Sequence, residues 1–255
     1  MSPAEIVAYI GAAAWLPQII SWIYKIVSRP RLKLISSPTL ELGYTTSGPI
    51  INLICSISAE RKDALIDKIE LELEHEKGEK RRLTWSFLNE KQHEIRYYKG
   101  ETAEISKNQP AIALKVPTIA LAEKKICFQD LEFQTNFILH VNKLAELQSF
   151  LKKKNSSPVE NLFVSKEFSD FVEFFKNQMY WKAGVYNLSV YIREVMLRHP
   201  YVERFCFTIS NNEIERLQEN CSELEKDVKM NLGVSAEESE HPKWNWVYPQ
   251  VKAIS

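Results

Sequence analysis

The sequence predicts a mainly β protein with helices (α+β): an N-terminal transmembrane helix, followed by an antiparallel β-sandwich with an inserted helical pair and a C-terminal helix. Three observations lead to this prediction. One long apolar run stands near the N-terminus. Alternating apolar and polar residues, typical of strands that bury one face, recur along the rest of the chain. Three stretches in that part instead repeat their apolar residues at the spacing of an amphipathic helix.

The apolar run covers residues 6–27 and is interrupted only by Gln18, Ser21 and Lys25. A helix needs about 20 apolar residues to cross a hydrocarbon core of about 30 Å, so this run is just long enough. A cleavable signal peptide fits less well, because no Lys or Arg precedes the run and it continues past the alanines at 12–14. A buried helix of a soluble domain is a second alternative. A helix lying in the membrane plane is a third, but it lacks a charged face.

Charge on the two sides of the run predicts its orientation. Glu5 is the only charged residue before it, whereas the positive residues Lys25, Arg29, Arg31 and Lys33 flank its C-terminal side. Cytoplasmic flanks carry the excess of Lys and Arg. We therefore expect a single-pass protein of the cell (inner) membrane, of bacterial type, with the N-terminus outside and the bulk of the chain in the cytoplasm.

Several residues suggest that the helix also assembles. The membrane-spanning and assembly residues that we single out are Ala8, Gly11, Ala12, Ala14, Pro17, Trp22 and Tyr24. Small residues on neighbouring turns let two helix backbones approach closely. Pro17 removes a backbone hydrogen bond and kinks the helix, while Trp22 and Tyr24 fit an aromatic belt at the cytoplasmic interface. The alternative is that the alanines only fill a generic span.

Composition excludes several classes of function. Lys plus Arg and Asp plus Glu each number 33, so the basic surface of a nucleic-acid-binding domain is not expected. The seven glycines lie too far apart to form a phosphate-cradling loop. No two cysteines form a C-x-x-C pair, and a cytoplasmic chain is kept reduced, which predicts free thiols. These cysteines are Cys55, Cys127, Cys206 and Cys221.

Alternation predicts the strands of the domain. Arg29-Pro30 ends the first helix, because the residue before proline avoids the helical region. Two alternating runs on either side of Gly78 predict a hairpin whose glutamates form a solvated outer face. The strands expected in this part are residues 32–35, 50–59, 68–75 and 82–87, two short strands with loops within 89–122, and 124–133.

The pattern changes at Thr135. Apolar residues at helical spacing predict helices from 135 to about 151 and from about 165 to 180, an inserted helical pair spanning 135–181. The aromatic stripe of the second helix, with Phe168, Phe171 and Phe175, is interpreted as core packing. Strands follow over 184–193 and 205–209.

A capping box formed by Ser210 and Glu213 predicts the start of the last helix, and Gly233 ends it. The tail is first acidic and then aromatic, with Trp244, Trp246 and Tyr248. Disordered segments are poor in aromatic residues, so we expect the tail to pack on the domain. The alternative is a docking peptide for another protein.

Two local patterns resemble immunoglobulin-like domains. Gly184-Val185-Tyr186-x-Leu188-x-Val190 is similar to their penultimate strand. Cys55, Trp85 and Cys206 follow the order of the inter-sheet bridge of antibody-type sandwiches, although Cys206 lies between Phe205 and Phe207 and faces away from the side that they bury. The resemblance implies an immunoglobulin-like sandwich. The expected domains are 1–28 (transmembrane anchor), 29–234 (cytosolic β-sandwich with the helical insertion at 135–181) and 235–255 (acidic, aromatic C-terminal tail).

The sequence shows no catalytic constellation. The five histidines are isolated, and a G-x-S-x-G nucleophile elbow is absent. We therefore expect no cofactor, no metal and no enzymatic activity, but a membrane-anchored binding or sensing module. Its expected partners are membrane lipid and either a second copy or another membrane or cytosolic protein. The first alternative is a defence-type membrane effector that oligomerises through its kinked helix and perturbs the bilayer. The second is an enzyme with a dispersed site.

Overall fold

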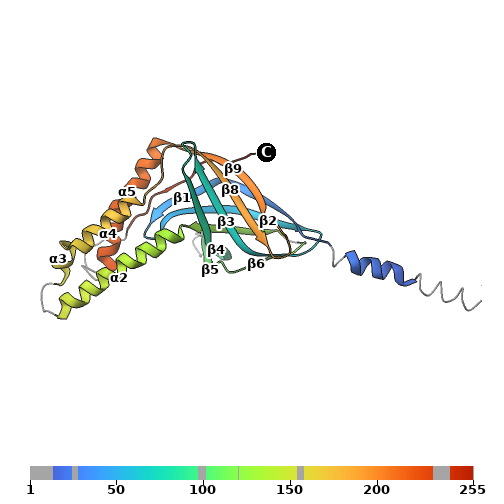
Figure 1. Ribbon diagram of the computed structural model, residues 1–255, viewed down its shortest axis with the longest axis horizontal. Coiled ribbons are helices and arrows are strands. Elements are labelled where there is room, and N and C mark those ends of the chain that lie inside the picture. The colour runs from blue at the N-terminus through green and yellow to red at the C-terminus, as the bar shows by residue number, and fades with distance from the viewer. Residues whose placement is uncertain are drawn as a thin grey trace, which may run out of the picture.

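A computed structural model describes residues 14–24, 28–96, 102–119, 121–153, 158–231 and 242–254. Within these residues the strands form one eleven-stranded antiparallel sheet that curls around a hydrophobic core, with the helices of residues 131–231 gathered at one end (Figure 1). The strand order is β10-β1-β2-β7-β4-β3-β8-β9-β11, while β5 pairs with β4 and β6 pairs with β3. The expectation of a mainly β protein with helices is confirmed.

The strands are β1 (Arg31–Thr45), β2 (Gly48–Glu60), β3 (Ala64–His75), β4 (Lys80–Arg96), β5 (Thr102–Pro110), β6 (Leu114–Val116), β7 (Ala122–Gln129), β8 (Gly184–Glu194), β9 (Tyr201–Ile209), β10 (Trp246–Val247) and β11 (Lys252–Ala253). The labelled helices are α2 (Leu131–Lys153), α3 (Pro158–Phe163), α4 (Lys166–Asn177) and α5 (Asn211–Asn231). Residues 14–24 form a further helix.

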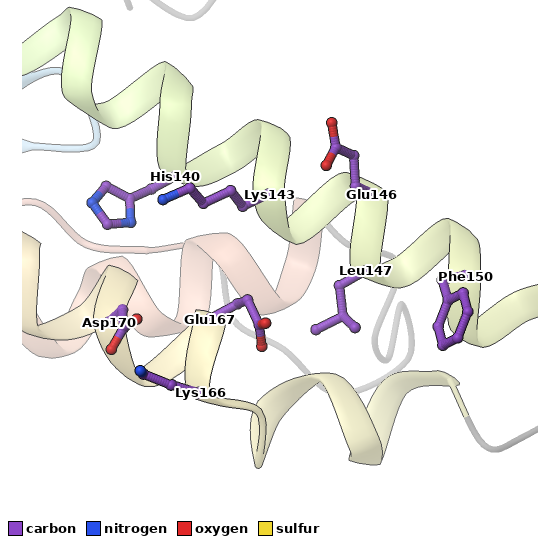
Figure 2. Close-up of a pocket in the computed structure, with 8 residues that line it drawn as sticks. All are labelled: His140, Lys143, Glu146, Leu147, Phe150, Lys166, Glu167 and Asp170. Atoms are coloured by element: carbon purple, nitrogen blue, oxygen red, sulfur yellow. The ribbon is translucent and has the colours of Figure 1, made fainter.

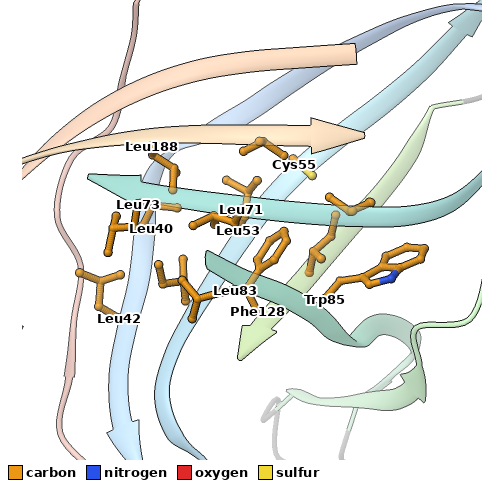
Figure 3. Close-up of a cluster of buried hydrophobic side chains, with 14 of the residues drawn as sticks. Leu40, Leu42, Leu53, Cys55, Leu71, Leu73, Leu83, Trp85, Phe128 and Leu188 are labelled. Carbon is orange, nitrogen blue, oxygen red and sulfur yellow. The ribbon is translucent and has the colours of Figure 1, made fainter. Parts of the chain in front are cut away.

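The core lies inside the curl of the sheet. Figure 3 shows leucines from five strands converging with Phe128 of β7; they are Leu40, Leu53, Leu71, Leu83 and Leu188. Each occupies the buried phase of an alternating strand, because successive side chains point to opposite faces. β3 and β4 form the predicted hairpin, with Glu72 opposite Arg82, and Gly78 adopts a positive φ of 86° in its turn.

The predicted sandwich is not confirmed. All described strands belong to a single sheet, in which β2 pairs with β7 and β7 pairs with β4, and no immunoglobulin-like arrangement is established. Alternation reports which face of a strand is buried, but it carries no information about which strands are neighbours. β1 extends from Arg31 to Thr45, far beyond the expected 32–35, with a register shift between Ser36 and Leu40.

The C-terminal segment connects the two ends of the sheet. Val247 of β10 lies opposite Leu42 of β1. A few residues later, Lys252 of β11 lies opposite Cys206 of β9. β1 and β9 are far apart in the strand order. This short segment therefore holds together the edges of a sheet that has curled back on itself.

The helices pack through aromatic side chains. α2 begins at Leu131, before the expected Thr135, because the Asp130 carboxylate accepts hydrogen bonds from the amides of Glu132 (2.9 Å) and Phe133 (3.2 Å). The aromatic stripe of α4 is buried as expected, and its Phe175 ring lies 4.4 Å from the Tyr44 ring. The insertion thus belongs to the same core as the sheet.

The capping box of α5 is confirmed. Glu213 Oε2 accepts from the Ser210 amide at 2.8 Å, and the Glu213 amide donates to Ser210 Oγ at 3.4 Å. All four cysteines are free thiols, also as expected.

The expected transmembrane helix is only partly covered by the structure. Residues 14–24 form a helix that stands away from the sheet (Figure 1), while 6–13 and 25–27 lie outside the described residues. No helix in the described part of the chain is both long enough and apolar enough to cross a membrane. The span over residues 6–27 is not confirmed.

Candidate functional site

The described anchor residues are all exposed. Seven large apolar side chains between Trp15 and Tyr24 have exposed fractions of 48% to 66%; they are Trp15, Leu16, Ile19, Ile20, Trp22, Ile23 and Tyr24. Ala14 and Pro17 are exposed as well. The remaining expected assembly residues, Ala8, Gly11 and Ala12, lie outside the described residues, and so does Lys25. The exposed helix is therefore a candidate contact site in itself.

The positive flank lies where the sheet begins. Arg29, Arg31 and Lys33 are exposed, and Arg31 opens β1 opposite Glu60, the last residue of β2. Lys33 alternates with the buried Leu32 and Leu34 and points to the outer face. The basic residues thus stand between the apolar helix and one end of the sheet.

The aromatic tail residues lie on the domain. The Trp246 ring covers Gly43 so closely that a Cβ there would lie 2.6 Å from the ring. Trp244 packs against the core, whereas Tyr248 is exposed. Asn220 of α5 fixes this segment, since its side chain donates to Asn245 O (2.8 Å) and accepts from Asn245 N (2.7 Å).

A pocket of about 320 Å³ opens on the outer face of the sheet beside β10. Four amide side chains and two aromatic rings line it; they are Asn52, Asn89, Asn108, Gln129, Phe87 and Trp246. Asn52 and Gln129 are themselves buried. Asn52 alternates with core residues of β2, so its outward direction was readable from the sequence. Sequence reasoning nevertheless missed the pocket, because its walls come from five separate strands.

The pocket carries almost no net charge. Glu41 accepts from Asn52 Nδ2 (3.0 Å) and pairs with Lys125, which also lines the pocket. Burial raises the pKa of the Cys127 thiol to about 11, so this thiol is protonated at neutral pH. Asn89 Nδ2 donates to Asn108 Oδ1 (2.8 Å). Such a surface of paired amides and aromatic rings suits a small neutral polar ligand.

A second, more open pocket of about 520 Å³ lies between α2 and α4 (Figure 2). Side chains of both charges line it, Lys143 from α2 and Glu167 and Asp170 from α4, and the His140 ring lies beside them. The His140 ring stacks on Phe174, with centroids 4.7 Å apart. Burial, and then the charge of Lys143, lower the pKa of His140, which favours the neutral ring near pH 7.

Neither pocket displays a recognisable catalytic arrangement. In the part of the chain that the structure describes, no three His, Cys, Asp or Glu side chains come together to hold a metal ion. No protein-family model, curated protein or solved structure matches this chain.

Proposed function

We propose that the protein is a single-pass, membrane-anchored, non-enzymatic binding or sensing module whose domain lies on the cytoplasmic side. The observation that carries this proposal is the exposure of the seven large apolar side chains of helix 14–24. Burying one such side chain is worth about 1.5–3 kcal/mol. Because roughly half of each side chain is exposed, covering all seven would stabilise the helix by about 5–10 kcal/mol. Lipid is the surrounding that the apolar run of 6–27 fits in length.

The outer-face pocket supports the binding part of the proposal. It joins buried amides with aromatic walls, a combination that fixes the orientation of a ligand without offering a nucleophile. The immunoglobulin-like sandwich is the architecture suggested by local patterns alone, and neither the anchor nor the pocket depends on it.

Membrane fractionation of the full-length protein tests the anchor. We expect the chain to resist extraction from membranes at high salt and alkaline pH. Replacing Ile19 and Ile20 together by Lys should release it, because charges near the middle of a spanning helix cost about 2.5–3.5 kcal/mol each. The matched control is Val164→Lys, an exposed position in the turn between α3 and α4, which should stay bound. A wild-type chain recovered in the soluble fraction would contradict the anchor.

The effector alternative is favoured by one specific observation. Ala14, Gln18 and Ser21 follow one another at helical spacing and share one face of an otherwise apolar helix. In lipid, amide and hydroxyl side chains hydrogen-bond across helices and stabilise pairs by about 1 kcal/mol. Replacing Gln18 and Ser21 by Leu should then reduce cross-linking between copies in membranes and lower any toxicity of expression. Unchanged cross-linking would remove this alternative.

A further inference from the structure

A cluster of exposed apolar side chains lies at the end of the sheet where β1 begins. Their exposed fractions range from 44% to 98%, with Ile119 the most exposed; the cluster consists of Leu65, Ile119, Leu121, Val195 and Met196. Scattered exposed apolar residues are ordinary, but contiguous ones mark contact with a protein or a membrane. We call these five residues the loop cluster.

Hydrogen bonds bring the segments of the loop cluster together. The Val195 amide donates to Leu65 O at 3.1 Å. The buried Glu194 carboxylate accepts from the Met196 amide at 2.8 Å and from the Leu65 amide at 3.4 Å. The loop that carries Ile119 is held to the same end, because the Thr118 amide donates to Asp63 Oδ1 at 3.0 Å. The cluster is therefore built from three segments, tied to one another through β3.

Leu121 belongs to the same end through β7. Its neighbour Ala122 opens β7 opposite Ile57, close to the end of β2. The last residue of β2, Glu60, lies opposite Arg31. The loop cluster thus borders the point at which the chain enters the sheet from the apolar helix.

Basic side chains surround the loop cluster. Arg29, Arg31, Arg61 and Arg198 are exposed at this end. The exposed acidic side chains at this end are fewer. They are Asp63, which pairs with Lys115 at 3.5 Å, and Glu60 and Glu123. An apolar centre with an excess of arginines complements an anionic lipid surface, which attracts basic residues within a short distance.

The chain length between helix and sheet keeps this end near the anchor. Seven residue steps separate Tyr24 from Arg31, so their Cα atoms lie at most about 25 Å apart. The helices α2 to α5 gather at the other end of the sheet (Figure 1). When the helix sits in a bilayer, the loop cluster is the end of the domain that can reach the surface.

We propose that the loop cluster is a second membrane contact, in which its apolar side chains enter the interfacial layer of an anionic leaflet while the surrounding arginines bind lipid phosphates. This contact rests on the proposed anchor. It orients the domain, with the helical end and its α2–α4 pocket directed away from the membrane. The helix supplies attachment, and the loop cluster supplies orientation and lipid selectivity.

Hydrogen exchange on the full-length protein in vesicles tests the contact. The protein is reconstituted in phosphatidylcholine alone and in phosphatidylcholine with phosphatidylglycerol, and retention on the vesicles is measured in parallel. We expect amide exchange in the segments that carry Ile119 and Met196 to slow several-fold in the anionic vesicles only. Ile119→Asp should abolish this protection, and Arg61→Glu should weaken it. Val164→Asp, at the opposite end, should leave it unchanged.

The outcomes separate the contact from the anchor. If the chain is retained on both kinds of vesicle but amide exchange in these loops is equally fast in both, the contact is overturned and the anchor is not. Equal protection in both lipids overturns the recognition of anionic headgroups. A chain that is not retained on the vesicles overturns the anchor and the contact together. Protection of the wild type that Ile119→Asp leaves intact would also overturn the assignment of the contact to these loops.

Discussion

The outer faces of the two halves of the sheet differ sharply. On β3 and β8 the outward side chains are charged and paired, as in Lys68–Glu70 at 2.9 Å and Arg193–Asp67 at 2.8 Å. On β2, β7 and β4 the outward side chains that line the pocket are mostly amides and apolar groups, with Lys125 as the charged exception. Both halves show the same alternation in sequence, yet one presents a solvated charged surface and the other a surface with a pocket.

The chemistry of the outward positions, rather than their periodicity, distinguishes the face that carries a pocket from the face that carries ion pairs. Exposed ion pairs remain hydrated and contribute little to stability. Buried amides such as Asn52 must find partners, because an unsatisfied buried amide costs about 1–3 kcal/mol. Glu41 supplies such a partner. The polar contacts of the pocket face therefore contribute more to stability than the ion pairs of the charged face.

The largest expected effect comes from the core that both halves share. Leu71 under the charged face and Phe128 under the pocket face are completely buried. Phe128→Ala should lower the free energy of unfolding by about 3–5 kcal/mol and Leu71→Ala by about 2–5 kcal/mol. Denaturant unfolding of the full-length protein in mild detergent should show a single transition for each variant. Two separate transitions would mean that the halves have independent cores.

A smaller effect is expected at the rim of the pocket. Gly43→Ala places a Cβ 2.6 Å from the Trp246 ring, whose backbone is held in β10. We expect a loss of about 1–3 kcal/mol and easier proteolysis of the C-terminal segment, because that segment must move. Ser36→Ala, also on β1, is the control and should be close to neutral. Unchanged protease resistance in Gly43→Ala would show that the indole can shift freely.

The two outer faces can be compared directly with matched substitutions. Asn52→Leu removes the hydrogen bond to Glu41 and should cost about 1 kcal/mol. Asn187→Leu is the matched change on β8, where the side chain is exposed, and should change stability by less than about 0.5 kcal/mol. Thermal unfolding of both variants measures the difference. Equal losses of stability in the two variants would show that the buried amide on the pocket face contributes no more than the exposed one on β8.

The smallest effect is expected from the charged face, and it depends on pH. The side-chain hydrogen bond from Arg193 lowers the pKa of Asp67 below its ordinary value. This pair therefore stabilises the fold above about pH 4, the ordinary range of an aspartate, and its contribution disappears as the pH falls through the lowered pKa. Asp67→Asn should reduce the drop in melting temperature between neutral pH and pH 3. An identical drop in both proteins would show that the pair contributes nothing.

Local patterns in the sequence were enough to predict many of the helices and strands. Alternation located the β3–β4 hairpin, the capping box located the start of α5, and the aromatic stripe identified the buried face of α4. The start of α2 was placed too late, because the cap provided by Asp130 lies inside what was expected to be a strand. A signal for the loop cluster was also present, since Ile119 and Leu121 are apolar residues close to Pro117, within the stretch 89–122 where two short strands with loops were expected.

The sequence by itself determined which residues alternate, where α5 is capped and where the long apolar run lies, because these depend on neighbours a few positions apart. Only the tertiary structure decided the strand order, the joining of β1 to β9 by the C-terminal segment, and the pocket. The pocket residues Asn52, Phe87, Gln129 and Trp246 are separated by tens of residues. These residues come together only when non-local strand pairing stabilises the fold by more than the entropy cost of closing long loops. No local pattern in the sequence contains that information.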